Sequence, residues 1–233
     1  METRNMEISA LETLRDGFLF LLVAVIVGIV AVLAGLIFII AAFGFMAAAP
    51  HGPSAFAGVI GAVATLLILL LVAVGIALYA IFGKIRPGMR QLSEIDDGFR
   101  ISYTGTTLIL VGLVIMVLGL IVVVAVFAAA GSSPETMRGA VIGGLTLFGV
   151  LVIGAIIALI GNILTFVVGA FKLQSRYQNS LYMAAGILFV IGIAFLLVGF
   201  SGILTLVGYV LMYIALGDTI NKLSTAAPTP AQA

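Results

Sequence analysis

Four long stretches without a single Asp, Glu, Lys or Arg constrain this chain more than any other feature. They cover residues 17–83, 101–134, 139–171 and 177–217. About 20 apolar residues suffice to cross a hydrocarbon core about 30 Å thick. With 64% hydrophobic and only 8% charged residues, the chain also has too little polar surface for a water-soluble domain. The sequence therefore predicts an integral membrane protein that interacts with the lipid bilayer.

The first charge-free run is long enough for two membrane spans. Residues 50–54 interrupt it with the cluster Pro-His-Gly-Pro-Ser, whose residues favour turns. We therefore predict two helices, at about 18–45 and 56–82, joined by a loop at this cluster.

The remaining runs predict four more spans. Two lie at about 104–130 and 139–171, on either side of a short turn at 131–134. As one helix, the last run would be about 55 Å long at a rise of about 1.5 Å per residue, so a hairpin is favoured there. We place its turn at 200–202 and a short final span at about 203–217. The expected fold is an all-α, polytopic membrane helical bundle of six transmembrane helices.

The positions of the basic residues predict how the chain is oriented. With six spans, nine of the ten Lys and Arg residues lie on one side of the membrane and only Arg138 lies on the other. By the positive-inside rule, both termini are expected to be cytoplasmic in a multi-pass protein of the cell membrane. We expect an amphipathic N-terminal segment at 1–16, a transmembrane domain at 17–217, and a cytoplasmic tail at 218–233 that is disordered from about residue 226.

Two segments ahead of odd-numbered spans place apolar residues at helical spacing. These residues are Ile8, Leu11, Leu14 and Phe18 in the first segment and Met89, Leu92, Ile95 and Phe99 in the second. This pattern is typical of helices that lie in the membrane interface. We therefore expect short interfacial amphipathic helices on the cytoplasmic side. Each is expected to end at a glycine, Gly17 or Gly98, in a left-handed conformation.

Internal repeats indicate that the spans are arranged in pairs. The segments Asp16-Gly17-Phe18 and Asp97-Gly98-Phe99 match. A Tyr or Thr also stands four residues before a Gly near the end of each even-numbered span, and glycines recur seven residues apart. These repeats predict three tandem helical hairpins. The glycines favour close packing between helices. The glycine motifs are Tyr79/Gly83, Thr165/Gly169 and Tyr213/Gly217, and the glycine pairs are Gly28/Gly35, Gly112/Gly119, Gly154/Gly161 and Gly192/Gly199.

Two segments carry a resemblance to a known family. Residues 89–107, MRQLSEIDDGFRISYTGTT, and residues 208–217, GYVLMYIALG, resemble an archaeal family of multi-pass membrane proteins known as domain of unknown function 973. The resemblance covers nearly the whole chain except 226–233. It implies a membrane protein with six spans. It implies no mechanism, because the family has no established catalytic or binding residues.

The composition excludes most kinds of chemistry. The chain has no Cys and one His, His51, which lies in an expected outer turn. Haem ligation, zinc sites and intramembrane proton relays need His, Cys or carboxylate groups inside the bundle, and no Gly-x-Ser-x-Gly nucleophile motif is present. A net charge of +1 offers no basic field for nucleic acid. We expect no enzyme activity, no catalytic residue, no metal or cofactor, and no nucleic-acid partner.

Asn162 is the one strongly polar side chain deep in an expected span. A buried amide needs a hydrogen-bond partner, so one interpretation is a structural bond to a neighbouring helix or to another subunit. The alternative is a polar lining of a path for a solute, formed with Thr146, Thr165 and Tyr209.

Two hypotheses about function follow. The first is a non-catalytic scaffold or accessory subunit, which packs against a second copy of itself or a larger membrane complex. The alternative is a passive channel or carrier for a small uncharged or apolar molecule. A continuous polar cavity that reaches Asn162 would favour transport, and a solid core would favour the scaffold.

Overall fold

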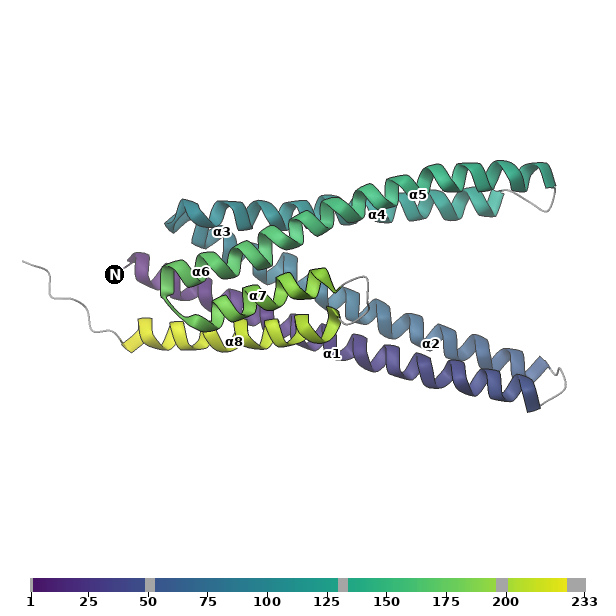
Figure 1. Cartoon of the computed structure of the whole chain (residues 1–233), viewed down its shortest axis with the longest axis horizontal. Helices are drawn as coiled ribbons and strands as arrows, with labels where there is room; N and C mark the ends of the chain where they lie inside the picture. Colours follow the sequence, from purple (N-terminus) through teal and green to yellow (C-terminus); the bar gives the residue numbers. More distant parts are fainter. Residues whose placement is uncertain (1, 49–52, 130–133, 196–200, 226–233) are drawn as a thin grey trace, which may run out of the picture. The chain divides into compact units, whose positions relative to one another are not determined.

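The computed structural model of the chain describes residues 2–48, 53–129, 134–195 and 201–225. Within these ranges, the side chains of 39, 42–48, 53–64, 67, 123–124, 127–129, 134–147 and 201 are outside the description. Every regular element in the described part is helical, which confirms the all-α prediction (Figure 1). The elements are α1 (Glu2–Ala48), α2 (Pro53–Leu78), η1 (Tyr79–Ile85), α3 (Arg86–Ile95), η2 (Asp97–Phe99), α4 (Arg100–Ala129), α5 (Pro134–Asn162), η3 (Ile163–Val168), α6 (Gly169–Tyr177), α7 (Ser180–Ala194) and α8 (Ser201–Thr225).

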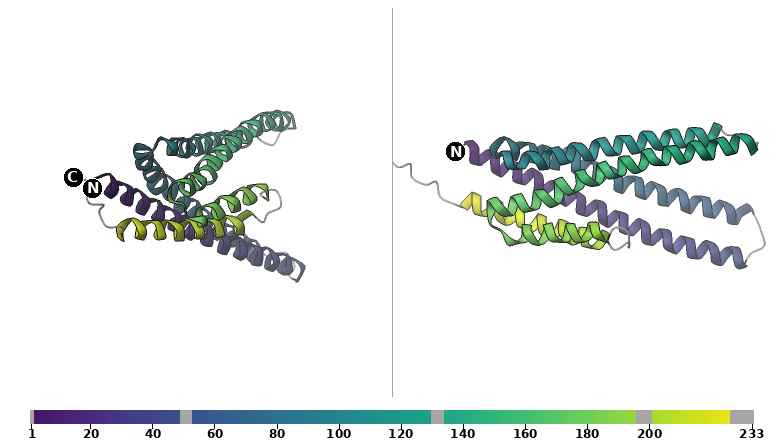
Figure 2. Two further views of the ribbon diagram at one scale, coloured as in Figure 1. Left: turned by 60° about the vertical axis from the view of Figure 1, so that its left-hand side comes forward. Right: turned by 45° about the horizontal axis from the view of Figure 1, so that its top comes forward.

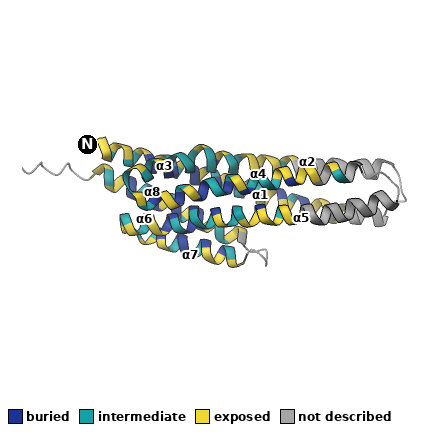
Figure 3. Ribbon diagram, turned by 90° about the horizontal axis from the view of Figure 1, so that it is seen from above, coloured by how far each residue is buried: buried dark blue, intermediate teal, exposed yellow. Residues whose placement is uncertain are grey.

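Most of these helices are long enough and apolar enough to cross a bilayer. In the described part of the chain, five helical segments meet that condition, and α7 is a shorter apolar helix. Exposed residues are widespread along them (Figure 3). They include many large aliphatic residues, such as Ile37 and Ile40, each 68% exposed. Such surfaces suit a hydrocarbon solvent and not water. The protein is therefore a multi-pass helical membrane protein. The five segments are Glu2–Phe38, Ile68–Ile95, Asp97–Val122, Phe148–Tyr177 and Gly202–Thr225.

Two of the helical rods contain a π-helical stretch at the same place in the repeated motif. Helix α2 continues through η1 into α3, and α5 continues through η3 into α6, without a break in the helical chain. Tyr79 and Gly83 both lie in η1. Thr165 lies in η3, which ends at Val168, immediately before Gly169. Tyr213 and Gly217, by contrast, lie in a continuous α-helix, α8. The first two hairpins thus share a backbone feature that the third lacks.

The chain forms two compact units. The first contains residues 1–88 and 191–233, and the second contains residues 89–190. In the first unit, α1 lies antiparallel to both α2 and α8 (Figures 1 and 2). The ring of Phe20 packs edge-on against Tyr79 at 5.1 Å between centroids, and Phe18 lies 5.9 Å from Tyr209. Aromatic pairs therefore hold α1 to η1 and to α8 near its N-terminal third.

In the second unit, α4 and α5 form a long antiparallel hairpin (Figure 2). Its helices come into backbone contact at glycines. A Cβ atom at Gly112 would lie 2.5 Å from the Gly154 carbonyl oxygen, and one at Gly161 would lie 2.7 Å from the Gly105 carbonyl oxygen. Only glycine fits such an approach. Close helix packing was the expected role of the spaced glycines, and Gly112, Gly154 and Gly161 perform it, joined by Gly105.

The expected left-handed caps at Gly17 and Gly98 are wrong. Gly17 lies inside α1 and Gly98 inside η2, and neither has a left-handed backbone. Gly17 serves packing instead, because a Cβ there would lie 2.7 Å from Cγ1 of Ile85. Among the described non-glycine residues, Gln178 alone is left-handed, with φ 52°, and it ends α6.

The expected boundaries of the last hairpin also need correction. Ser201 and Gly202 begin α8 and do not form the turn, because Ser and Gly are favoured at helix starts as well as in turns. The short helix of this pair is α7, with 15 residues, whereas α8 has 25 and runs past Asp218 to Thr225. The charge at Asp218 ends the apolar run but not the helix. The predicted turns at 50–54 and 131–134 and the tail from 226 fall largely or wholly outside the described residues.

Candidate functional site

Asn162, the leading polar candidate, lies where α5 meets η3. It is half-buried, and its side chain makes no capping hydrogen bond to the helix that follows. It shares its rod with Thr165, which is buried and whose hydroxyl donates to the Gly161 carbonyl oxygen at 2.8 Å. The Thr165 hydroxyl is therefore satisfied within its own helix. Both roles considered for Asn162, an interhelical bond and a path lining, stay predictions.

No described contact places the other two candidates, Thr146 and Tyr209, beside Asn162. The side chain of Thr146 is outside the description, although its backbone belongs to α5. Tyr209 belongs to α8 in the first unit, where it is buried and packs against Phe18. The predicted set of four residues is thus divided between the two units.

A cavity of about 430 Å³ lies in the first unit between α1, α2 and α8. Its walls are aliphatic side chains and two glycines, and Asn162 does not contribute to it. A site with these walls suits an apolar group and offers no hydrogen bond from a polar side chain. The lining residues are Val25, Gly28, Ile29, Val32, Leu33, Leu70, Gly202 and Ile203.

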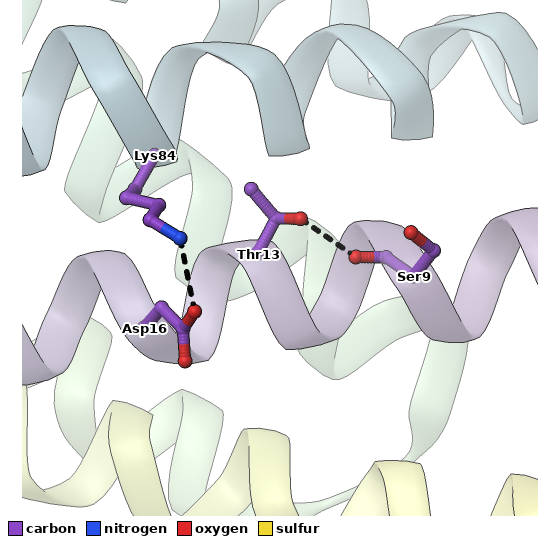
Figure 4. A network of polar contacts seen from close by, with 4 residues as sticks. All are labelled: Ser9, Thr13, Asp16 and Lys84. Carbon is purple, nitrogen blue, oxygen red and sulfur yellow. Dashed lines mark hydrogen bonds and ion pairs between the residues drawn. The ribbon is translucent and has the colours of Figure 1, made fainter.

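The polar interactions gather at the charged ends of the helices. In the first unit, the Nζ atom of Lys84 on η1 donates to Oδ2 of Asp16 on α1 at 3.0 Å (Figure 4). Thr13, less than one turn before Asp16, donates its hydroxyl to the Ser9 carbonyl within α1. The Lys84–Asp16 pair therefore joins the two helices of the first hairpin at the ends of its apolar run.

A matching ion pair joins the second hairpin. Nη1 of Arg176 on α6 donates to Oδ2 of Asp96 at 2.9 Å, and Oδ1 of Asp96 accepts the Gly98 backbone N–H at 2.8 Å. The Gly98 hydrogen bond first, and then Arg176, hold the pKa of Asp96 below its ordinary value. This carboxylate fixes the corner between α3 and α4 and attaches it to α6.

Sequence reasoning missed these pairs, although a signal was present. It singled out Asp97 as the counterpart of Asp16, whereas Asp96 makes the contact. Basic residues stand three and seven positions after the motif glycine in both hairpins, at Arg86/Arg90 after Gly83 and at Lys172/Arg176 after Gly169. This repeated spacing of basic residues after each span indicates the end of the hairpin at which the ion pairs form.

A third polar contact attaches α8 to α1. Nη2 of Arg15 donates to the Tyr213 hydroxyl at 3.0 Å, and the Arg15 guanidinium carbon lies 4.6 Å from the centre of the Tyr213 ring. The guanidinium also lies against Gly217, 3.5 Å from the position that a Cβ would take there. Hydrogen bonding and cation–π attraction together fix the orientation of this charged group.

These sites hold helices together. In the part of the chain that the structure describes, no group of three or more His, Cys, Asp or Glu residues is placed to hold a metal ion. The fold and these sites define the class of protein. It is a multi-pass helical membrane protein whose inter-helix ion pairs, in the part of the chain described, lie at the ends of the apolar runs. Residues 7–233 match the family described as "Protein of unknown function (DUF973)", and the chain belongs to that family. Neither a curated protein nor a solved structure matches it.

Proposed function

We propose that the protein is a non-catalytic structural component of the cell membrane, a scaffold or accessory subunit with both termini in the cytoplasm. The observation that carries this proposal is the backbone contact of α4 and α5 at Gly105, Gly112, Gly154 and Gly161. Helices in backbone contact leave no room for a solute between them. The hairpin is thus suited to rigidity, and its outer faces are available to lipid or to another protein.

The placement of polar groups supports the same proposal. Asp16, Asp96 and Thr165 are each engaged in contacts within or between helices of their own unit. The cavity in the first unit is lined by no polar side chain. A path for a polar solute needs lining groups that are free to replace water, and none of these features supplies such a lining.

The test is purification of the tagged full chain from its native host in a mild detergent, with chemical crosslinking before solubilisation. A scaffold or accessory subunit is expected to be recovered in a defined complex, with itself or with another membrane protein, at a fixed ratio. A matched sample with Gly112→Leu, which forces α4 and α5 apart, is expected to lose that complex. A monomer that crosslinks to nothing would contradict the proposal.

A second candidate is a passive carrier for a small apolar molecule, and the cavity in the first unit favours it. Gly28 lines this cavity and has no atom within 4 Å of its Cβ position. A Cβ atom at Gly28 would therefore meet no neighbour, and Gly28→Leu would add a side chain at the cavity wall. Gly75 on α2 is equally open but does not line it, so Gly75→Leu is the matched control. Carrier activity in liposomes that is lost only in Gly28→Leu would favour this candidate.

The same liposomes test the role of Asn162. If Asn162 is a structural hydrogen-bonding group, the substitution Asn162→Leu is expected to change the free energy of unfolding by at most about 2 kcal/mol in either direction. It is also expected to leave any flux unchanged. Uptake of a solute by the wild type that is abolished in a stably folded Asn162→Leu variant would overturn the scaffold proposal.

A further inference from the structure

Arg15 lies at the boundary between the apolar and charged parts of the first unit. It is the last cation of α1 before the charge-free run that begins at residue 17, and Lys84 is the first cation after that run. Tyr213, its partner on α8, lies in the apolar part just ahead of Asp218. Tyr and Arg side chains at the end of an apolar span lie at the level of lipid headgroups.

The guanidinium of Arg15 is fixed but carries an unbalanced charge. Tyr213 takes one Nη2 hydrogen and supports the plane of the group, while Nε is buried beside Gly217 without a hydrogen-bond partner. The adjacent carboxylate of Asp16 is paired with Lys84. Among the described residues, no ion pair to Arg15 is found, and its remaining polar edge is the one formed by Nη1 and Nη2.

An apolar stripe leads from Arg15 into the span. On α1, large aliphatic side chains that follow Arg15 at intervals of three or four residues are exposed at successive turns. One side of α1 thus offers a fixed cation at its charged end and a continuous aliphatic surface beneath it. A phospholipid has the same order of groups, a phosphate followed by acyl chains. The stripe consists of Leu19, Val23, Ile26 and Val30, exposed by 44, 41, 53 and 55%.

We propose that Arg15, held by Tyr213, binds the phosphate of an anionic phospholipid in the leaflet on the side of the N-terminus, with an acyl chain along the Leu19–Val30 stripe. A guanidinium recognises phosphate through two parallel N–H bonds, and in Arg15 the Nη1 atom and the second hydrogen of Nη2 can present this fork. The unpaired cation favours a lipid with net negative charge over a zwitterionic one. The stripe favours a lipid over a soluble phosphate, which has nothing to place against it.

The test is native mass spectrometry of the full chain in detergent with equal amounts of phosphatidylglycerol and phosphatidylcholine. The wild type is expected to retain phosphatidylglycerol preferentially. Arg15→Gln is expected to lower that retention about tenfold, since losing a charge-assisted hydrogen bond weakens the binding affinity by about that factor or more. Arg90→Gln is the matched control, because it removes one exposed cation whose partner is Glu94, and it is expected to retain the lipid.

Further arms separate the sources of phosphate and guard against misfolding. Arg15→Lys keeps the charge without the planar fork and is expected to retain an intermediate amount of lipid. Tyr213→Phe removes the hydroxyl that holds Nη2 and is expected to weaken retention while leaving helicity unchanged. Millimolar inorganic phosphate is expected not to displace the lipid. Equal retention by Arg15→Gln and wild type, an equal loss in Arg90→Gln, or displacement by inorganic phosphate would each overturn the proposal.

Discussion

At the scale of single residues, glycine has different roles in this protein depending on what faces it. Gly161 faces backbone atoms of α4, whereas Gly149, on the same helix, has no atom within 4 Å of its Cβ position. The sequence shows both simply as glycines in an apolar helix. It therefore predicted glycine-mediated packing correctly for 112, 154 and 161, but it cannot distinguish which glycines are obligatory, because that depends on the partner helix.

Replacing these two glycines with alanine is expected to have opposite effects. At Gly161 the added Cβ would lie 2.6 Å from the Ile109 backbone nitrogen, and since backbone cannot move aside, a loss of about 1–3 kcal/mol is expected. Gly149→Ala, on the same helix, is expected to be neutral or to stabilise by up to about 1 kcal/mol through helix propensity. Thermal unfolding of both variants in detergent compares them, and equal melting temperatures would contradict the packing described for α4 and α5.

Asp96 gives the second prediction at this scale. Because its pKa is lowered by the Gly98 N–H and by Arg176, its contribution is fully present above the ordinary carboxyl pKa and is lost as pH falls through the lowered folded-state pKa. Amide-exchange protection at Gly98, corrected for the intrinsic pH dependence, is expected to fall in acid, below about pH 4.

The control for this titration is the neighbouring carboxyl group. Asp96→Asn keeps an oxygen that can accept the Gly98 N–H but removes the charge, so the acid-dependent loss of protection is expected to disappear. Asp97→Asn changes an adjacent residue for which no ion pair is found in the described part of the chain, and it is expected to keep the wild-type profile. Identical profiles in the two variants would show that Asp96 does not hold the corner.

At the scale of elements, apolar periodicity predicted where helices occur but not where they end. The first span was expected to begin at about residue 18 and the last to end at about 217, yet α1 begins at Glu2 and α8 continues to Thr225. Buried side chains explain the extension, since Leu11 and Leu14 on α1 and Thr219 and Ile220 on α8 are buried outside the charge-free runs. The π-helical stretches had no local signal beyond the repeated motif, because a π-turn depends on how the whole rod packs.

The segment around α3 allows a prediction for an element. It is helical over Arg86–Ile95, close to the 89–98 expected from its amphipathic pattern. With Met89 and Leu92 buried and Arg90 exposed, we expect this amphipathic helix to lie at the membrane surface and its amides to be protected from exchange in nanodiscs. Exchange as fast as that of the tail at 226–233 would contradict this prediction.

At the scale of the whole molecule, the number and type of helices followed from hydropathy because a bilayer permits few alternatives for an apolar backbone. The grouping of residues into two units did not follow, since contacts such as Arg15 with Tyr213 join segments 198 positions apart. The candidate site was predicted least well. Asn162 was chosen for its polarity, whereas the ion pairs and Arg15 depend on which helices become neighbours.

Membrane orientation is the prediction for the whole chain. Single cysteines are readily introduced because the chain has none of its own. With both termini cytoplasmic, an impermeant thiol reagent is expected to label Cys at Ser54 or Ser133 from outside and not at Ser93 or Ala226. Labelling of Ala226→Cys from outside would mean an odd number of spans and a reversed C-terminus.

The glycine contacts between α4 and α5 also limit how related sequences can diverge. A position whose Cβ would strike backbone cannot drift toward Ala or Ser through small steps, whereas an open glycine can. Across the family, Gly105, Gly112 and Gly161 are therefore expected to be nearly fixed, while Gly28, Gly75 and Gly149 vary freely. In evolutionary terms, the positions where α4 and α5 touch through glycine are expected to permit few substitutions, and the open glycine positions are expected to change.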